Sequence, residues 1–439
     1  MRDSVNTEKF IMTKATGRST NFFLIGVIVF AFALRLSVTF ATGSYRVVED
    51  DTDHFGFGWE MGRVARSIDE GKGFSSPLPL PTGPTAIVGP VYPVLLAGIF
   101  KLFGVYSTSS AIVVRIMQSA FASLTCLFLY LCGRDAVGES TGKLAALLWV
   151  VFPLNIFFTS AKVWETSLSG LLVAALLWTM LPLRDSLSIT RWSATGALLA
   201  IAGLTNTSLV VLILPFAIAA LWRSRARVLL PACLGALTCL VLVSPWVIRN
   251  YHQFGKVMLR SNFPLEFRIG NNEFSYGQKI EALHPSNTPS INQHWQEVGE
   301  SQFMEEERVA NAQYLSTHHG RFAFSTVNRI VNYWTGAWIK PIEGFSNSWP
   351  VIISTSALTL LGLLGIGQMF RRGIPAAAMF AGCLLIYPVA YYLTTSQPRF
   401  YHAMTPLLIM ATSYWMVNIL SQIRLRATAQ QKPSTATAA

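Results

Sequence analysis

An acidic cluster follows the first long apolar stretch of the chain and comprises Glu49, Asp50, Asp51, Asp53 and Glu60. Gathering carboxylates at a membrane surface is unfavourable, because like charges repel one another and each charge prefers full hydration. A carboxylate held in this way can take the proton of a hydroxyl group as a general base. An aromatic run, residues 54–59 (HFGFGW), lies inside the cluster. This segment is therefore the first candidate for chemistry.

The elements that must position these carboxylates are membrane helices. Hydrophobic residues make up 52% of the chain and charged residues only 13%, well below the charged fraction of a soluble domain. The apolar residues come in blocks of about 16–24, the length that crosses the hydrocarbon core as helix. The net charge of +12 comes with no basic motif of a nucleic-acid-binding protein, and cytoplasmic loops rich in Lys and Arg account for it.

Apolar stretches mark the expected membrane helices of an all-α polytopic protein. They fall at about 22–41, 88–104, 109–132, 142–158, 166–182, 192–206, 207–222, 228–247, 351–369, 375–395 and 401–420. If every stretch crossed, the basic connections at residues 223–227 and 371–372 would face outward, against the positive-inside bias. The stretch at 88–104 is short and carries Pro90, Pro93 and Lys101. We therefore expect it to lie along the membrane or re-enter it, which leaves about ten crossings with both chain ends inside.

This topology places the candidate chemistry on the outer side. The acidic cluster, the connection with Lys162 and Glu165, the long stretch 248–350 and the connection 396–402 all face outward. The five cysteines lie in apolar segments without metal-type spacing. The expected organisation is a basic N-terminus (1–21), a transmembrane module (22–247) with outer loop 43–108 and juxtamembrane helices, a small periplasmic subdomain (248–350) with an interfacial helix near 327–340, further transmembrane helices (351–420) and a disordered tail (421–439).

Four short motifs resemble, in the same order, those of the GT-C glycosyltransferases of the protein O-mannosyltransferase (family 39-like) and lipid A aminoarabinose-transferase type. They are residues 60–65 (EMGRVA) with 71–74 (GKGF); 89–96 (GPVYPVLL) with 100–104 (FKLFG); 245–250 (PWVIRN) with 254–256 (FGK) and 270–272 (GNN); and 399–402 (RFYH) with 406–408 (PLL). The resemblance implies a GT-C bundle. It also implies transfer of a hexose or pentose from a polyprenyl-phosphate donor to a hydroxyl of a lipid, glycan or protein.

The resemblance also suggests which carboxylates act. Glu60 takes the position of the catalytic base, and Asp51 and Asp53 follow it, since residues 53–56 (DHFG) resemble a run of the mannosyltransferases. The chain departs from the family in one respect, because Met61 stands where relatives carry a second, adjacent acidic residue. Glu165 matches a second outer carboxylate. Its alternative is a structural carboxylate at a helix N-terminus, paired with Lys162.

A phosphate leaving group needs positive charge, and arginine offers two parallel hydrogen bonds. Arg249, Arg268 and Arg399 are the candidates, although Arg249 can equally be an interfacial anchor at its helix end. No cofactor is certain, and a divalent metal ion stays open, since His54, His252 and His402 face outward without metal-type spacing. The expected partners are therefore the lipid-linked donor, membrane lipid and the acceptor, without nucleic acid.

Two other functions stay open. A transporter or flippase of lipid-linked sugars would also be polytopic, but it predicts ionisable residues at the membrane midplane. Residues 351–439 contain no acidic residue, which argues against it. An O-antigen ligase or polymerase would use Arg and His of the long outer loop more than carboxylates after the first helix. The expected location is the bacterial inner membrane, with the site facing the periplasm.

Overall fold

The computed structural model describes residues 2–47, 57–336 and 349–430, and these residues form helices joined by loops, with no β-strand. The bundle helices are α1 (Arg2–Thr42), α4 (Thr108–Val137), α5 (Glu139–Val151), α6 (Pro153–Ser160), α7 (Thr166–Met180), α8 (Ile189–Thr205), α9 (Ile213–Ser224), α10 (Leu229–Phe254), α14 (Trp349–Arg371), α15 (Ala376–Ile386), α16 (Val389–Leu393) and α18 (Thr405–Gln430). The remaining helices are α2 (Glu60–Asp69), α3 (Val91–Phe103), α11 (Phe263–Gly270), α12 (Pro289–Thr317), α13 (His319–Thr335) and α17 (Pro398–His402). The prediction of an all-α polytopic protein is confirmed.

Seven helical stretches of the described chain are long and apolar enough to cross a membrane, or eight if the bent pair α5–α6 forms one span. About ten crossings were expected. The difference lies in residues 189–254, because α8 has only 17 residues and α9 and α10 fall within one apolar stretch of 48 residues. A turn at Arg225, whose φ is 51°, separates α9 from α10. The chain therefore still reverses direction in this region.

The helix α3 is too short to span a membrane. Its 13 residues extend over roughly 20 Å at 1.5 Å per residue, against about 30 Å of hydrocarbon. Pro90 precedes its first residue, and Gly104, with a φ of 91°, ends it. This length agrees with the expectation that residues 88–104 do not cross.

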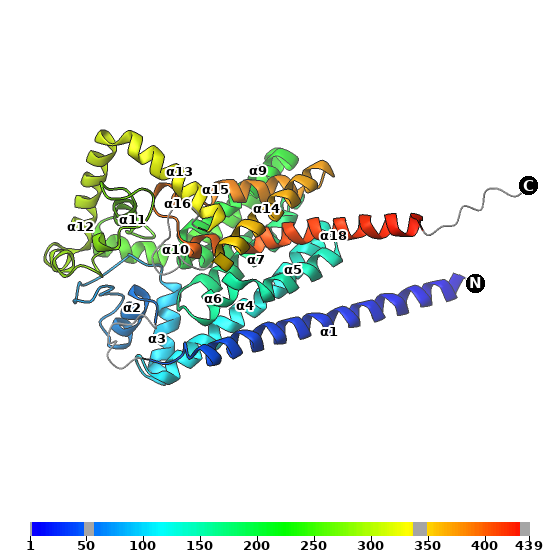
Figure 1. Ribbon diagram of the computed structural model, residues 1–439, viewed down its shortest axis with the longest axis horizontal. Coiled ribbons are helices and arrows are strands. Elements are labelled where there is room, and N and C mark those ends of the chain that lie inside the picture. Colours follow the sequence, from blue (N-terminus) through cyan, green and yellow to red (C-terminus); the bar gives the residue numbers. More distant parts are fainter. Residues whose placement is uncertain (1, 48–56, 337–348, 431–439) are drawn as a thin grey trace, which may run out of the picture.

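The molecule has two distinct ends (Figure 1). The start of α1 and the end of α18 both lie at the right of this view, whereas α2, α3, α11 and α12 lie at the left. The helix α18 continues to Gln430, so residues 421–430 are helical and not part of a disordered tail. The predicted interfacial helix near 327–340 corresponds to α13, which ends at Thr335. Residues 337–340 of the expected helix lie outside the described residues.

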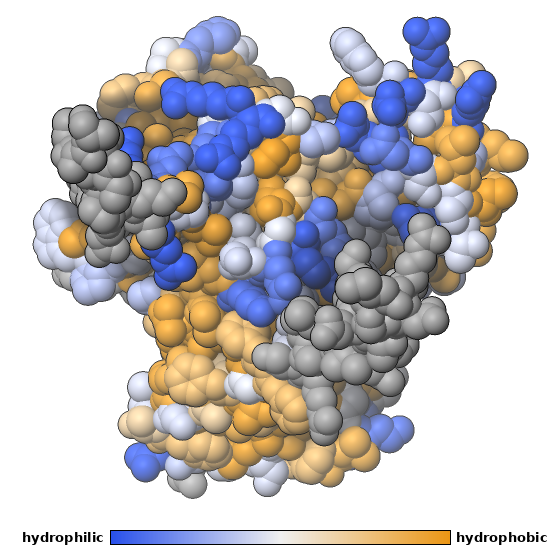
Figure 2. All heavy atoms as spheres, turned by 90° about the vertical axis from the view of Figure 1, so that its right-hand side faces the viewer, coloured by the Kyte–Doolittle hydropathy of each residue, from blue (hydrophilic) through white to orange (hydrophobic). Residues whose placement is uncertain are grey.

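Small residues let the bundle helices approach closely, as is common in membrane proteins. A Cβ atom added to Gly133 of α4 would lie 2.7 Å from the Cα of Gly142 in α5. The outer surface of the bundle exposes large apolar side chains, such as Phe22, Ile218 and Leu240. Figure 2 shows the end at which the termini lie, with broad hydrophobic surface in its lower part and hydrophilic residues in the middle and above. The exposed apolar side chains of the bundle helices fit a hydrocarbon environment.

Candidate active site

A cavity of about 770 Å³ opens at the end of the bundle that carries α2 and α11. Its lining comes from residues within 58–61, 87–88, 158–165, 206–208, 259–287 and 390–400. These segments include the outer connections that the charge distribution grouped on one side, so the structure brings them together. The walls combine aromatic rings with acidic and basic side chains, as expected of a site for a partly apolar, partly charged ligand.

Glu60 reaches the cavity from the first residue of α2. The helix buries Met61, Val64 and Ala65 on one face, an i, i+3, i+4 pattern that fixes its orientation on the protein. A carboxylate in the first turn also interacts favourably with the helix dipole. The side chain of Glu60 is 20% exposed, so it is largely enclosed and still reachable from the cavity.

The turn before Glu60 holds it against the connection that carries Glu165. Gly58 has a φ of 85°, and a Cβ atom added there would lie 2.6 Å from the carbonyl oxygen of Val163. Trp59 adopts a φ of 54°, a left-handed conformation that is costly for a residue with a Cβ. Backbone strain of this kind is often found at functional sites. The first outer loop and the α6–α7 connection therefore meet directly at the cavity.

Two groups from the long outer stretch contact the carboxylate of Glu60. The Nε2 atom of His284 lies 3.5 Å from its Oε1, and the hydroxyl of Ser286 donates to the same oxygen at 3.4 Å. Arg63, one turn along α2, donates to the Ser286 hydroxyl at 3.3 Å and to the carbonyl of Pro77 at 3.1 Å. Glu60 is thus positioned by residues separated from it by more than two hundred positions in the sequence.

The surroundings keep Glu60 ionised. Burial alone would raise its pKa, but the neighbouring His284, Arg63 and Lys279 and a backbone hydrogen bond hold the pKa below its ordinary value. Burial lowers the pKa of His284, against the attraction of Glu60, so its imidazole is neutral at pH 7 and can accept or donate a hydrogen bond. A carboxylate that is ionised at neutral pH is available to take a proton.

Glu165 lines the cavity from the position just before α7. Its Oε2 atom is buried and has no hydrogen-bond partner among the described residues, and its side chain makes no capping hydrogen bond to α7. Lys162, on the same connection, lies with its Nζ atom 5.9 Å from the ring centroid of Trp164. A buried polar atom without a partner is unfavourable. No hydrogen bond to the start of α7 therefore supports the alternative that Glu165 is a structural carboxylate at the helix N-terminus.

Arg399, in α17 near the end of the chain, also lines the cavity. Its guanidinium and the ammonium group of Lys162 both lie near the ring of Trp164. Its guanidinium carbon lies 5.1 Å from the ring centroid of Trp164 and 4.9 Å from that of Phe400. The Nε atom of Arg399 is buried and has no hydrogen-bond partner in the described chain. The guanidinium thus lies beside two aromatic rings, and its Nε donor makes no hydrogen bond to the described residues. This arrangement suits an incoming anion.

The structure does not bring Arg249 and Arg268 to the cavity lining. Arg249 donates to the carbonyls of Thr85 and Phe74 at 2.6 and 2.7 Å, and Trp246 stacks near its guanidinium. Arg268 lies 3.8 Å from Glu307. Arg249 thus matches its alternative as an anchor at the end of α10, and the phosphate role of both residues stays a prediction.

Asp51 and Asp53, with His54, lie outside the described residues. Within the described ranges, no group of three or more His, Cys, Asp or Glu side chains could hold a metal ion. His402 is buried beside Phe158 and Trp149, and its ring nitrogens have no hydrogen-bond partner among the described residues. His252 lies beside Tyr251, away from the cavity lining. A divalent metal ion is therefore still only a prediction.

Sequence reasoning missed several charged residues of the cavity, namely Arg260, Glu266, Lys279, Glu281 and His284. Glu266 has a buried Oε2 atom without a hydrogen-bond partner among the described residues. Lys279 lies 3.0 Å from Glu281. All belong to the polar stretch after α10, in which neither periodicity nor a motif singles them out. Only the excess of charged residues over the rest of the chain could have drawn attention to this stretch.

A buried carboxylate holds the outer loop to the long stretch. Glu300 of α12 accepts hydrogen bonds from the hydroxyl of Thr85 at 2.5 Å, the backbone amide of Ala86 at 2.8 Å and the hydroxyl of Ser261 at 2.6 Å. Burial raises the pKa of Glu300. These bonds place Ile87 beside Arg260, which donates to its carbonyl at 2.8 Å, and both residues line the cavity.

Comparisons with known proteins bear on this arrangement. Residues 86–248 match the family described as dolichyl-phosphate-mannose-protein mannosyltransferase. The structure resembles that of the archaeal oligosaccharyltransferase AglB from Archaeoglobus fulgidus, in complex with an inhibitory peptide and a dolichol-phosphate, with a TM-score of 0.57. The identity is 15%, and the match covers 95% of this chain and 53% of AglB.

The chain has the GT-C fold. It spans about half the length of AglB. A second structure of the Archaeoglobus oligosaccharyltransferase, in complex with Zn and sulfate, matches with a TM-score of 0.54 at 14% identity, covering 92% of this chain and 50% of that one. ArnT from Cupriavidus metallidurans, bound to undecaprenyl phosphate, matches with a TM-score of 0.42 at 14% identity, covering 93% of this chain and 81% of ArnT. No curated protein matches the chain.

Proposed function

We propose that this GT-C protein is a membrane glycosyltransferase that moves a sugar from a polyprenyl-phosphate donor to a hydroxyl acceptor in the cavity. The observation that carries the proposal is the convergence of an ionised Glu60 and the unpartnered groups of Glu165 and Arg399 in one partly aromatic cavity. The dolichol-phosphate in the AglB complex and the match of residues 86–248 to a dolichyl-phosphate-mannose-dependent family support a lipid-phosphate donor.

In the proposed reaction, the acceptor hydroxyl attacks the anomeric carbon of the sugar. Glu60 takes the hydroxyl proton as the new carbon–oxygen bond forms, and the bond from that carbon to the phosphate oxygen breaks. The phosphodiester becomes a phosphomonoester and gains negative charge, which Arg399 receives through its unused donor. His284 and Ser286 hold the Glu60 carboxylate in place. Glu165 is proposed to orient the acceptor or the sugar hydroxyls.

The orientation follows from charge. The cavity end carries the acidic residues of the outer loops, whereas the opposite end carries basic connections such as residues 223–227. The positive-inside bias therefore favours a cavity that faces the outer side of the membrane. We propose the periplasmic face of a bacterial inner membrane as its location. The sugar, a hexose or a pentose, and the acceptor, whether lipid, glycan or protein, belong to the same proposal.

The test is sugar transfer from a panel of radiolabelled polyprenyl-phosphate sugars in membranes that contain the wild type, Glu60→Gln or Glu70→Gln at matched protein levels. Glu70 directly follows α2 and pairs with Lys72 at 2.6 Å on the surface, so its variant is a matched control. Transfer by the wild type and by Glu70→Gln, with loss in Glu60→Gln, supports both the class and the base. Equal transfer by Glu60→Gln would move the base to Asp53 or Asp51. If no donor supports transfer, the glycosyltransferase proposal fails.

A further inference from the structure

A second pocket lies at the end of the bundle opposite the cavity. It encloses about 540 Å³ and is lined by Asp185, Leu187 and residues 223–227 (RSRAR). The helix α7 begins beside Glu165 at the cavity and leads to Asp185, while the turn from α9 to α10 supplies the arginines. We call this site the basic pocket. The proposed glycosyl transfer makes no use of it.

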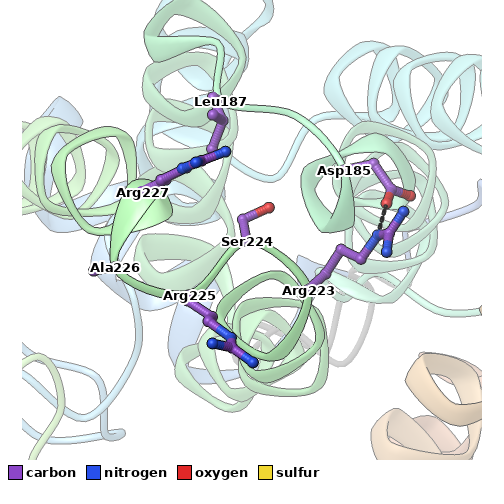
Figure 3. A pocket seen from close by; sticks show the side chains of 7 residues that line it. All are labelled: Asp185, Leu187, Arg223, Ser224, Arg225, Ala226 and Arg227. Carbon is purple, nitrogen blue, oxygen red and sulfur yellow. Dashed lines mark hydrogen bonds and ion pairs between the residues drawn. The ribbon is translucent and has the colours of Figure 1, made fainter.

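The basic pocket holds positive charge that the described protein groups do not neutralise. Asp185 is its single acidic residue, and it pairs with Arg223 at 3.1 Å and with Arg184 at 3.9 Å. Figure 3 shows Arg223 reaching Asp185, with Arg225 and Arg227 on the other side of Ser224. Neither Arg225 nor Arg227 has an ion pair or hydrogen bond to any described residue. Their guanidinium groups therefore keep all of their donors for a ligand.

Exposed apolar side chains adjoin in sequence the arginines that line the basic pocket. Leu187 lies in the lining. Trp222, which directly precedes Arg223 in the sequence, is 87% exposed. Leu229 and Leu230, which begin α10, are 52% and 64% exposed. Exposed tryptophan next to arginine is typical of the level of the lipid headgroups. The pocket thus joins a cationic centre to a surface that acyl chains can cover.

We propose that the basic pocket binds the phosphate group of an anionic phospholipid of the leaflet opposite the cavity. Arg225 and Arg227 would donate charge-assisted hydrogen bonds to the phosphate oxygens, since the guanidinium fork matches a phosphate. Ser224, which also lines the pocket, adds a hydroxyl to it. The positive-inside bias explains why arginines lie at this end, but it requires neither a pocket lined by three of them nor two guanidiniums without an ion pair or hydrogen bond to the described residues.

The experiment compares phospholipid retention by the full-length chain and two double variants in nanodiscs. The lining variant is Arg225→Gln with Arg227→Gln. The matched control is Arg424→Gln with Arg426→Gln, which removes the same charge at the same spacing from the exposed end of α18. Each protein is purified from nanodiscs of phosphatidylcholine with one-fifth phosphatidylglycerol. Bound lipid is counted by native mass spectrometry, and thermal unfolding of each variant checks its fold.

Each arginine near a membrane surface contributes about fivefold to the binding of an anionic lipid, so the lining variant should retain phosphatidylglycerol at least tenfold more weakly. The control variant should match the wild type. Equal loss in both variants, or no loss in either, would overturn the proposal. Full displacement of phosphatidylglycerol by millimolar inorganic phosphate would also overturn it, because the ligand would then be the free anion. If the lining variant unfolds, Arg227→Lys, which keeps the charge but loses the fork, takes its place and should bind at an intermediate level.

Discussion

The two ends of the bundle carry charge in different ways. At the cavity end, acidic and basic side chains from distant segments lie in a shared, largely enclosed space, and Glu60 contacts His284 and Ser286. At the opposite end, the arginines of one short turn lie at an open surface, and Arg223 pairs with the exposed Asp185. Enclosed charge must be compensated by specific partners, whereas exposed charge is hydrated at little cost.

This difference predicts how far the effect of a substitution extends at each end of the bundle. An enclosed charge persists only if its neighbours are fixed, so each substitution at the cavity end should affect several groups together. An exposed charge acts almost independently, and its removal should change little beyond its own ligand. The predictions that follow test this contrast, beginning with the strongest effect.

The largest effect is expected for the two carboxylates of the cavity. Glu60→Gln should lower kcat by about a hundredfold or more, because a positioned general base contributes roughly 10²–10⁴-fold. Glu165→Gln should lower transfer less, by about tenfold, because a residue that orients hydroxyl groups takes no proton and a glutamine amide still forms hydrogen bonds. The measurement is steady-state sugar transfer by purified protein. A greater loss in Glu165→Gln than in Glu60→Gln would exchange their proposed roles.

The next effect distinguishes Arg249 from Arg399, which the sequence analysis proposed for the same phosphate-binding role. Arg399→Gln should raise the KM for the donor by about 10–100-fold, the contribution of hydrogen bonds to a charged phosphate. Arg249→Gln should leave KM almost unchanged and lower the melting temperature, since the carbonyls of Thr85 and Phe74 would lose their donor. Donor titrations and thermal unfolding of both variants provide the measurement. A raised KM in Arg249→Gln would restore its phosphate role.

A smaller effect is expected where the first outer loop meets the α6–α7 connection. Gly58→Ala should destabilise the protein by about 1–3 kcal/mol, because the added Cβ both contacts the carbonyl of Val163 and requires a positive φ. Gly71→Ala is the matched control, because its φ is also positive, at 75°, but no atom lies within 4 Å of the added Cβ. Chemical denaturation of both variants should show a greater loss at Gly58. Equal losses would mean that the contact with Val163 has no energetic weight.

The smallest effect is a pH dependence of stability at the cavity end. Burial lowers the pKa of His284 below its ordinary value of 6.5, so the unfolded chain takes up a proton below that pH while the folded chain does not. Stability should therefore fall with decreasing pH from about 6.5, by up to roughly 1.4 kcal/mol per pH unit. The lowered pKa of Glu60 acts in the same direction only at lower pH, below its ordinary value of 4.5.

His284→Gln removes this titration, so its melting temperature should depend less on pH between 6.5 and 5 than that of the wild type. The groups that face His284 electrostatically are Glu60, Lys279, Glu266 and Glu281, and the variant leaves them in place. Thermal unfolding at closely spaced pH values is the measurement. An unchanged slope in the variant would show that His284 does not set the pH dependence in this range.

Sequence reasoning predicted the fold better than the site. Apolar blocks and the bias of Lys and Arg predicted the polytopic helical fold and the non-spanning α3, because both follow from local composition. Glu60, Glu165 and Arg399, which the structure places at one cavity, came from short motifs or their position in the chain. Their neighbours His284 and Lys279 could not be predicted, since burial and long-range contacts bring them there. Arg249 donates to backbone carbonyls, whereas Arg399 lines the cavity, and the sequence does not reveal this difference.

The lining of the cavity draws on segments that extend from residue 58 to residue 400 of a 439-residue chain. Among the segments that line the cavity, the one with Glu60 is synthesised first, whereas Arg399 is added only with the last tenth of the chain. Until Arg399 is made, the Trp164 ring lacks the guanidinium beside it, whereas His284, the neighbour of Glu60, is already part of the chain. Insertion of the final helices is thus the step that completes the site. A chain released before α17 would lack Arg399 and at least part of the lining that residues 390–400 supply to the cavity.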